Sequence, residues 1–113
     1  MIAKKNRFHG HKSVSRVRGN RVQLDIGTVY YARTNRTDYR LAVIVSKKTA
    51  RLAVTRNRIR RRIFESFRKQ QLLDGKSIDA VFVVRKETVA SMPATDLDNM
   101  LAKAAAKMTA TKS

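Results

Sequence analysis

Residues 53–69, AVTRNRIRRRIFESFRK, carry a dense run of cationic side chains with Glu65 as their single acid. Like charges three or four positions apart destabilise a helix, so folding alone does not favour this composition. The planar guanidinium group of arginine binds phosphate oxygens through paired hydrogen bonds and stacks on nucleobases. The stretch therefore predicts a surface for a phosphate polymer. The residues assigned to it, together with basic residues just upstream, are Lys47, Lys48, Arg51, Arg56, Asn57, Arg58, Arg60, Arg61, Arg62 and Arg68.

The same stretch has the periodicity of an amphipathic helix. Ile59, Ile63 and Phe67 fall four residues apart in one apolar stripe, while most of the arginines fall on the opposite side. Thr55 or Asn57 is expected to cap the helix, which would run to about residue 72. A solvated charged face is the alternative explanation, but such faces normally mix both signs of charge.

The whole chain is strongly basic. Its 113 residues include 26 Lys and Arg against 8 Asp and Glu, a formal net charge of +18. This imbalance favours nucleic acid as a partner. An anionic membrane surface is an alternative, but no membrane partner is predicted, because the apolar stripes are expected to be used by the core and no run of about 18 apolar residues indicates a membrane span. Zero cysteines exclude disulfides and thiolate zinc sites and fit a cytoplasmic protein. The length indicates one domain over residues 1–113, with a basic arm at about 1–12 and a basic tail at about 109–113.

The apolar pattern predicts six elements in the order αββαβα. A short helix near Ser13 precedes a strand over residues 22–33, in which Tyr30 and Tyr31 face opposite sides. A polar turn is expected to join this strand to residues 41–45 as a hairpin. After the arginine-rich helix come a buried strand over residues 78–84 and a last helix with a capping box and an apolar stripe. The capping box is Thr95 to Asp98, and the stripe is Leu97, Leu101, Ala104 and Met108. The predicted fold class is an α/β (α+β) sandwich, one small mixed sheet with helices packed on it.

No catalytic constellation is evident. His9 and His11 could begin a metal site, but the sequence offers no third ligand near them, so no metal site is predicted. The aspartates fall at turns, strand starts and helix caps, where Asp has structural roles. An alternative function is a nuclease that cleaves RNA with its own aspartates, but the sequence contains no catalytic motif that supports it.

Residues 46–68, SKKTARLAVTRNRIRRRIFESFR, resemble the signature of the bacterial ribonuclease P protein family. In that signature a strand ending in Ser-Lys-Lys leads through a short loop to Ala-Val-x-Arg-Asn-Arg and a basic helix closing in Glu-x-Phe. The matching positions are Ser46, Lys47, Lys48, Ala53, Val54, Arg56, Asn57, Arg58, Glu65 and Phe67. Weaker similarity extends over nearly the whole chain.

The resemblance implies a subunit that binds the catalytic ribonuclease P RNA and holds the 5′ leader of precursor tRNA in a cleft along the sheet. The RNA would carry out the Mg²⁺-dependent hydrolysis that matures the tRNA 5′ end, so the protein would bind no cofactor of its own and need no protein partner. The resemblance also implies a left-handed strand–helix–strand crossover, against the usual preference. The residues expected along the leader cleft are Val14, Val17, Arg18 and Tyr31.

The sequence departs from the family pattern at a few positions. Val14 and Arg18 stand where the family usually has aromatic residues. Arg18 would therefore contact the leader through a phosphate group or by stacking its planar guanidinium group on a base. Phe64 stands where the family often has Arg, and Arg62 where it is often apolar, which would rotate the cationic face. A ribosomal-type protein that only stabilises folded RNA is the main alternative, since it shares this size and charge.

Overall fold

The computed structural model describes residues 20–34 and 38–110, which form a four-stranded sheet and two long helices. The predicted helix near Ser13 and the cleft residues Val14, Val17 and Arg18 lie outside the described residues. The strands are β1 (Asn20–Leu24), β2 (Gly27–Arg33), β3 (Arg40–Val45) and β4 (Ile78–Val84); the helices are α2 (Ala53–Gln70), the short 3-10 helix η2 (Glu87–Ala90) and α3 (Ala94–Ala110).

The sheet is mixed, with the strand order β1-β2-β4-β3. β2 pairs antiparallel with β1 and with β4, whereas the edge strand β3 runs parallel to β4. Parallel neighbours need a crossover connection, and α2 supplies it. The predicted class, one small mixed sheet with helices packed on it, is confirmed. The unit β3–α2–β4 is the one for which the family resemblance implies a left-handed crossover.

The predicted single strand over residues 22–33 is wrong, because the chain reverses within it. Asp25 and Ile26 form a two-residue turn that pairs Leu24 with Gly27 and joins β1 to β2 as a hairpin. A glycine is needed there, since a Cβ at position 27 would lie 2.1 Å from the carbonyl oxygen of Val83 in β4. Apolar and polar residues alternate straight through the turn, so periodicity alone predicts one strand. Three strands therefore precede α2, where the order αββαβα has two.

The polar segment after β2 does not close a hairpin, contrary to the prediction. β4 lies between β2 and β3 in the sheet, so these two strands are not neighbours. The residue types of a turn do not show whether the two strands it joins are neighbours in the sheet or are separated by a third strand, here β4, that comes later in the sequence. Residues 35–37 of this segment lie outside the described part.

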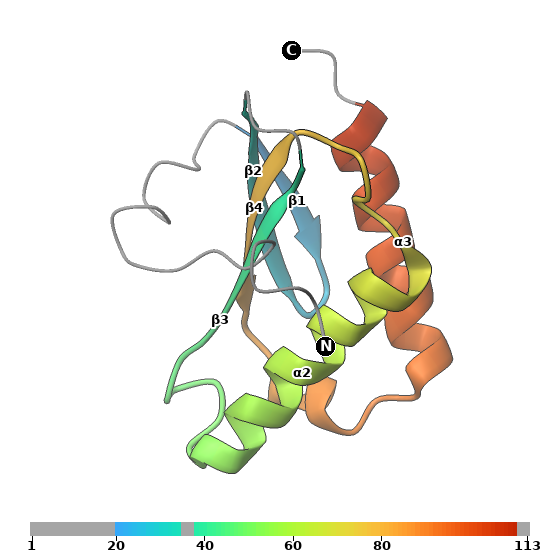
Figure 1. The fold of residues 1–113 in the computed structure, drawn as a ribbon. Helices are drawn as coiled ribbons and strands as arrows, with labels where there is room; N and C mark the ends of the chain where they lie inside the picture. The colour runs from blue at the N-terminus through green and yellow to red at the C-terminus, as the bar shows by residue number, and fades with distance from the viewer. Residues whose placement is uncertain (1–19, 35–37, 111–113) are drawn as a thin grey trace.

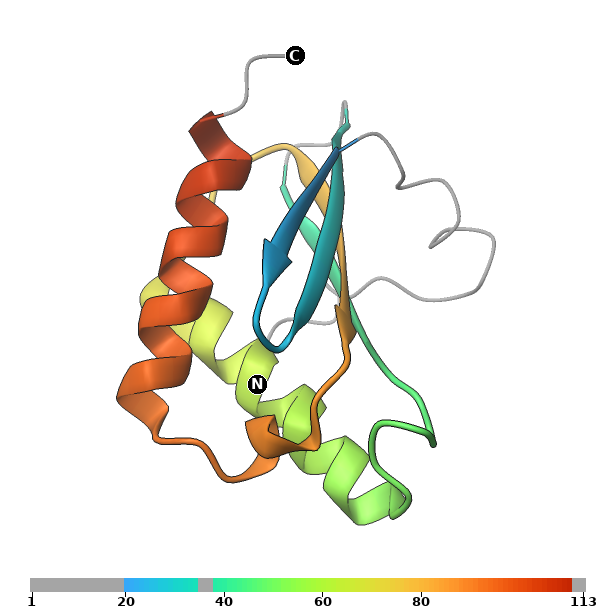
Figure 2. The same cartoon turned by 180° about the vertical axis from the view of Figure 1, so that it is seen from behind.

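The helices α2 and α3 pack on the same face of the sheet, with α3 alongside β1 and α2 beside β3 (Figure 1 and, from behind, Figure 2). The core lies between these two layers. From α2 it takes the predicted stripe of Ile59, Ile63 and Phe67, each at most 1% exposed. From α3 it takes the other predicted stripe, Leu97, Leu101, Ala104 and Met108. Packing therefore fixes which side of α2 is left for solvent.

Candidate nucleic-acid interface

The arginine-rich helix α2 begins at Ala53, earlier than the predicted caps Thr55 and Asn57. The carbonyl oxygen of Leu52 accepts the backbone N–H groups of Thr55 and Arg56, which places Thr55 inside the first turn. Leu52 itself occupies the cap position with an extended backbone and makes no side-chain hydrogen bond to the helix. The first turn holds no acidic residue, so positive charge dominates from the start of α2.

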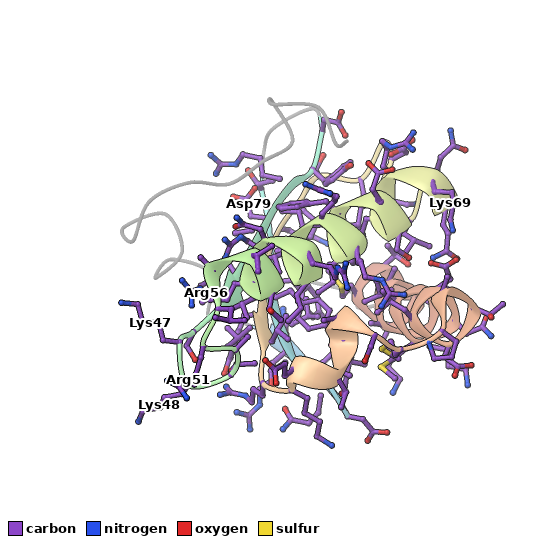
Figure 3. All side chains as sticks on the ribbon, turned by 90° about the horizontal axis from the view of Figure 1, so that it is seen from below. Lys47, Lys48, Arg51, Arg56, Lys69 and Asp79 are labelled. Carbon is purple, nitrogen blue, oxygen red and sulfur yellow. The ribbon has the colours of Figure 1, made fainter. Side chains whose placement is uncertain are left out.

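A basic loop, residues 46–52, leads from β3 into α2. Thr49 anchors it to the sheet, because its Oγ1 donates to the carbonyl oxygen of Val84 in β4 at 3.2 Å. The cations of the loop gather at the N-terminal end of α2 and point away from the protein (Figure 3). They are Lys47, Lys48 and Arg51, all exposed. The structure thus places these three residues next to α2, with whose arginines they were predicted to form one phosphate-binding surface.

Arg56 holds the basic loop against the helix. Its Nη1 donates to the carbonyl oxygens of Ala50 at 3.0 Å and of Arg51 at 2.9 Å. The guanidinium group is therefore directed back at the loop backbone from the first turn of α2. Arg56 was predicted as a phosphate contact, and the structure gives it a positioning function as well.

Arg58 and Arg61 form the open part of the cationic face. Both are exposed, and within the described residues no carboxylate pairs with either guanidinium group. Arg60 is half-buried and donates to the side-chain oxygen of Asn57 one turn earlier. The side of α2 opposite the core stripe is therefore cationic, as the helical periodicity predicts.

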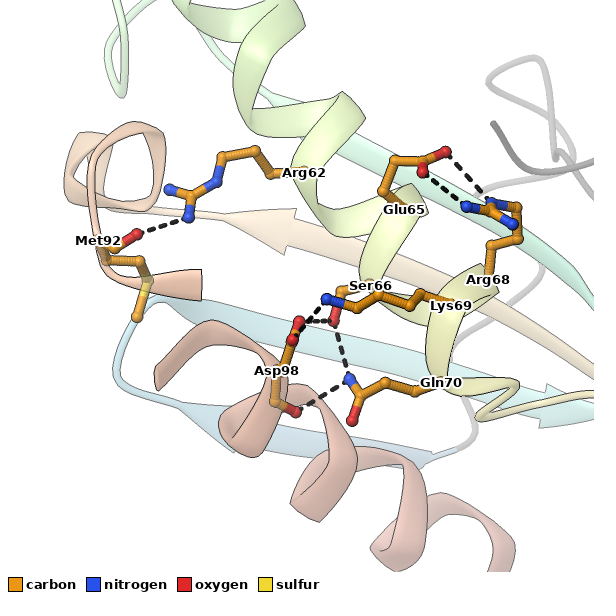
Figure 4. A network of polar contacts seen from close by, with 8 residues as sticks. All are labelled: Arg62, Glu65, Ser66, Arg68, Lys69, Gln70, Met92 and Asp98. Carbon is orange, nitrogen blue, oxygen red and sulfur yellow. Dashed lines mark hydrogen bonds and ion pairs between the residues drawn. The ribbon is translucent and has the colours of Figure 1, made fainter. Parts of the chain in front are cut away.

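Arg62, which was predicted as an RNA contact, is half-buried and is engaged by the fold. Its Nη1 donates to the carbonyl oxygen of Val89 at 2.6 Å and its Nη2 to that of Met92 at 2.5 Å. These carbonyls lie in η2 and in the connection to α3, so Arg62 ties both segments to α2. Figure 4 shows the hydrogen bond to Met92. This engagement explains how an arginine occupies a position that is often apolar in the family pattern.

Two further cations of α2 are paired at its C-terminal end (Figure 4). The Nη2 of Arg68 lies 2.9 Å from Oε2 of Glu65, and this hydrogen-bonded pair lowers the pKa of Glu65 to about 2. Lys69 reaches across to α3, with its Nζ 2.8 Å from Oδ2 of Asp98. The positive charge of Arg68 is thus partly compensated, unlike that of Arg58 and Arg61.

Asp98 connects the two helices and does not close the predicted capping box. The hydroxyl of Ser66 donates to its Oδ1 at 2.6 Å, and Gln70 donates to its carbonyl oxygen at 3.1 Å. Hydrogen bonds from Lys69 and Ser66 lower the pKa of Asp98 below its usual range. The carboxylate therefore faces α2 rather than the N-terminus of its own helix, α3.

The sheet face turned away from α2 and α3 carries Tyr30, not the predicted Tyr31. Tyr31 is 6% exposed and belongs to the main core. Tyr30 is half-buried on the opposite face, where it packs with Ala42 and Val81. Because the chain reverses at the β1–β2 turn, Val22 pairs with Val29 and the two share the core face. The odd-numbered positions of β2, including Tyr31, therefore lie on the face that a single continuous strand would give to the even-numbered positions.

Arg85 and Lys86 are exposed cations that the sequence-based prediction omits. They follow β4 directly, and the carboxyl ends of the parallel strands β3 and β4 meet at one edge of the sheet, with Val45 paired to Val84. The basic loop leaves β3 at this same edge. The parallel pairing was the missing signal, because it alone places these two cations next to the loop.

In the ranges 20–34 and 38–110, no group of three or more acidic or histidine side chains is arranged to hold a metal ion. No helix in these ranges is long and apolar enough to cross a membrane.

The fold and the surface together define a small α+β protein that turns an arginine-rich helix toward solvent beside a basic loop. The sequence model of the Ribonuclease P family matches residues 2–109, and the chain therefore belongs to this family.

Individual relatives are similar over part of their length. The ribonuclease P protein component of Pseudanabaena sp. is 46% identical over 78 residues, which cover 63% of this chain and 64% of the relative. That of Pseudomonas putida is 49% identical over 57 residues, 49% of this chain and 41% of the relative. The matched part thus spans less than two thirds of either relative.

Solved structures share the fold over most of the chain. The RNase P protein of Staphylococcus aureus superposes with a TM-score of 0.74 at 26% identity, covering 93% of this chain and 95% of that one. The RNase P protein of Thermotoga maritima also gives 0.74, at 20% identity, covering 86% and 92%, a similarity of fold alone.

Proposed function

We propose that this chain is the protein subunit of ribonuclease P and that it binds the catalytic RNA through α2 and the basic loop. Membership of the family supports this proposal. The observation that carries it is the outward face of α2, where Arg58 and Arg61 are exposed beside Lys47, Lys48 and Arg51. Each guanidinium group can donate two parallel hydrogen bonds to one phosphate group, a geometry that the ammonium group of lysine does not offer.

Precursor tRNA is the second RNA partner in this proposal. Its 5′ leader would lie along the sheet face opposite α2 and α3, where Tyr30 takes the place assigned to Tyr31. The catalytic RNA would hydrolyse the phosphodiester bond with Mg²⁺ held mainly by RNA, and the chain would supply no catalytic residue. Its Lys and Arg side chains would replace part of the counterion atmosphere and so lower the Mg²⁺ requirement. The cytoplasm would be the place of this reaction.

Binding selectivity tests the proposal against a ribosomal-type protein. The affinity of the chain would be measured for ribonuclease P RNA and for a ribosomal RNA fragment of equal length, over a series of salt concentrations. We expect tighter binding to ribonuclease P RNA, with log affinity falling by about 0.7 to 0.9 per unit of log salt for each phosphate contacted. Equal affinity for both RNAs would favour the ribosomal-type alternative, and a response independent of salt would contradict the electrostatic mechanism.

A further inference from the structure

Two large aliphatic side chains, Leu52 and Val54, extend into solvent at the start of α2. They are 64% and 71% exposed, and the only other exposed large hydrophobic residue in the described part of the chain is Ile44 at 37%. Single exposed aliphatic residues are common on protein surfaces. Here, however, two of them stand two positions apart at the junction of the basic loop with the helix.

Local folding does not require either residue. Ser, Thr, Asp or Asn at the cap position would stabilise the helix relative to an apolar residue such as Leu52, which makes no capping hydrogen bond. A β-branched residue such as Val54 also has a lower helix propensity than Ala or Leu. Both positions therefore hold residues that are less favourable for the isolated protein than common alternatives, which indicates a contact made in a complex.

The positions of Leu52 and Val54 are fixed in advance by the surrounding hydrogen bonds. Arg56 binds the carbonyl oxygens of the two residues that precede Leu52, Ala50 and Arg51. Thr49 ties the same loop to β4. Because this junction is already ordered, less conformational entropy is lost when a partner binds to it.

The charge around the pair determines the chemistry of the partner. Lys47, Lys48 and Arg51 precede it, Arg58 follows it, and residues 39–64 contain no acid at all. A second copy of this chain would bring two such cationic surfaces together, which electrostatic repulsion opposes. RNA offers both phosphates and, in unpaired segments, exposed faces of its bases. A polyanion that also presents apolar faces fits the surface best.

We propose that Leu52 and Val54 form an apolar contact for an unstacked nucleobase of the RNA bound by α2 and the basic loop. This inference rests on the proposed function and deepens it. Phosphate contacts release counterions and are therefore salt-dependent, whereas an apolar contact to a base adds affinity without that release. The two kinds of contact can thus be separated by experiment.

The test compares the double variant Leu52→Ser and Val54→Ala with the wild type in binding to ribonuclease P RNA at several salt concentrations. Serine at position 52 can cap α2 and alanine favours the helix, so the variant is expected to fold. Ile44→Ala serves as the matched control for aliphatic loss elsewhere. We expect the double variant to bind about tenfold more weakly, with an unchanged slope of log affinity against log salt, and the control to bind as the wild type does.

The possible outcomes separate this inference from the proposed function. An unchanged affinity of the double variant, while the wild type binds normally, would overturn the inference alone. Failure of the wild type to bind ribonuclease P RNA would contradict the proposed function and the inference with it. If the double variant keeps its RNA affinity but loses self-association in sedimentation, the pair belongs to a contact between copies and the inference is wrong.

Discussion

At the scale of single residues, the arginines of α2 divide into those that bind the protein and those that extend from it. Arg56 and Arg62 each donate to two backbone carbonyls, and Arg68 pairs with Glu65. Arg58 and Arg61 have no such engagement in the described residues. Charge alone therefore does not identify an RNA contact, because the hydrogen-bond partners of each guanidinium group decide whether it is available.

The neighbours Arg61 and Arg62 provide a matched pair of variants. Arg61→Ala should lower the salt slope of RNA binding by about 0.7 to 0.9, the equivalent of one phosphate contact, and leave the free energy of unfolding nearly unchanged. Arg62→Ala should instead lower the free energy of unfolding by about 1 to 3 kcal/mol, because two carbonyls lose their donor. Salt titrations and denaturant unfolding measure the two effects. A strongly destabilised Arg61→Ala variant would show that the outward face of α2 is wrongly assigned.

Tyr30 and Tyr31 provide a second pair, on opposite faces of β2. Tyr31→Ala should destabilise the protein by about 3 to 5 kcal/mol, as expected for a large buried aromatic side chain. Tyr30→Ala should weaken binding of precursor tRNA to the complex but not of mature tRNA, which has no leader. Comparing the two tRNAs by equilibrium binding checks this, and an equal loss for both would exclude Tyr30 as a leader contact.

At the scale of elements, the surface depends on two junctions. The basic loop is fixed to the start of α2 by Arg56 and to β4 by Thr49. The opposite end of α2 is fixed to α3 by the hydrogen bonds around Asp98. These contacts orient the helix relative to the sheet, and hence the cationic face relative to the sheet face proposed for the leader.

The first junction is tested by Arg56→Lys, which keeps the positive charge. We expect weaker RNA binding with a nearly unchanged salt slope, because the shorter ammonium group cannot hold both loop carbonyls in the same geometry. The matched control is Arg58→Lys, which should bind more tightly than Arg56→Lys if Arg58 makes only a phosphate contact. Equal affinities of these two variants would contradict a positioning function of Arg56.

The second junction gives a pH dependence. The pKa of Asp98 is lowered in the folded state, so its contribution to stability is present above the unfolded value of about 3.9 and is lost as pH falls through the folded value. Asp98→Asn should therefore be less stable than the wild type at pH 7, by at most about 1 kcal/mol for a partly exposed pair. The difference should begin to shrink as pH falls below about 4 and should vanish only once pH is below the lowered folded pKa of Asp98. Denaturant unfolding at several pH values measures it, and a difference that persists in acid would point to a cause other than this charge.

The elements also show what the sequence could and could not predict. The apolar stripes of α2 and α3 and the strand β4 follow directly from periodicity, because each buries a continuous set of side chains. The β1–β2 turn at Asp25 and Ile26 was not predicted, since alternation continues through it and only Gly27 marks the reversal. The insertion of β4 between β2 and β3 depends on long-range pairing, which local residue patterns do not contain.

At the scale of the whole molecule, the basic composition and the family motif predict where the cationic surface lies but not how it is completed. The parallel pairing of β3 and β4 brings Arg85 and Lys86 beside the basic loop. Tertiary hydrogen bonds engage two of the donors of the half-buried Arg62. Both effects depend on segments distant in sequence, so local residue patterns could not predict them.

The most direct test of the proposed function is cleavage of precursor tRNA at low Mg²⁺ by ribonuclease P RNA alone, by this protein alone and by the two together. Neutralisation of phosphates by the protein should let the mixture cleave where the RNA alone is slow. We expect only the mixture to produce the correct 5′ end efficiently. Cleavage by the protein alone, or a mixture no more active than the RNA, would contradict it.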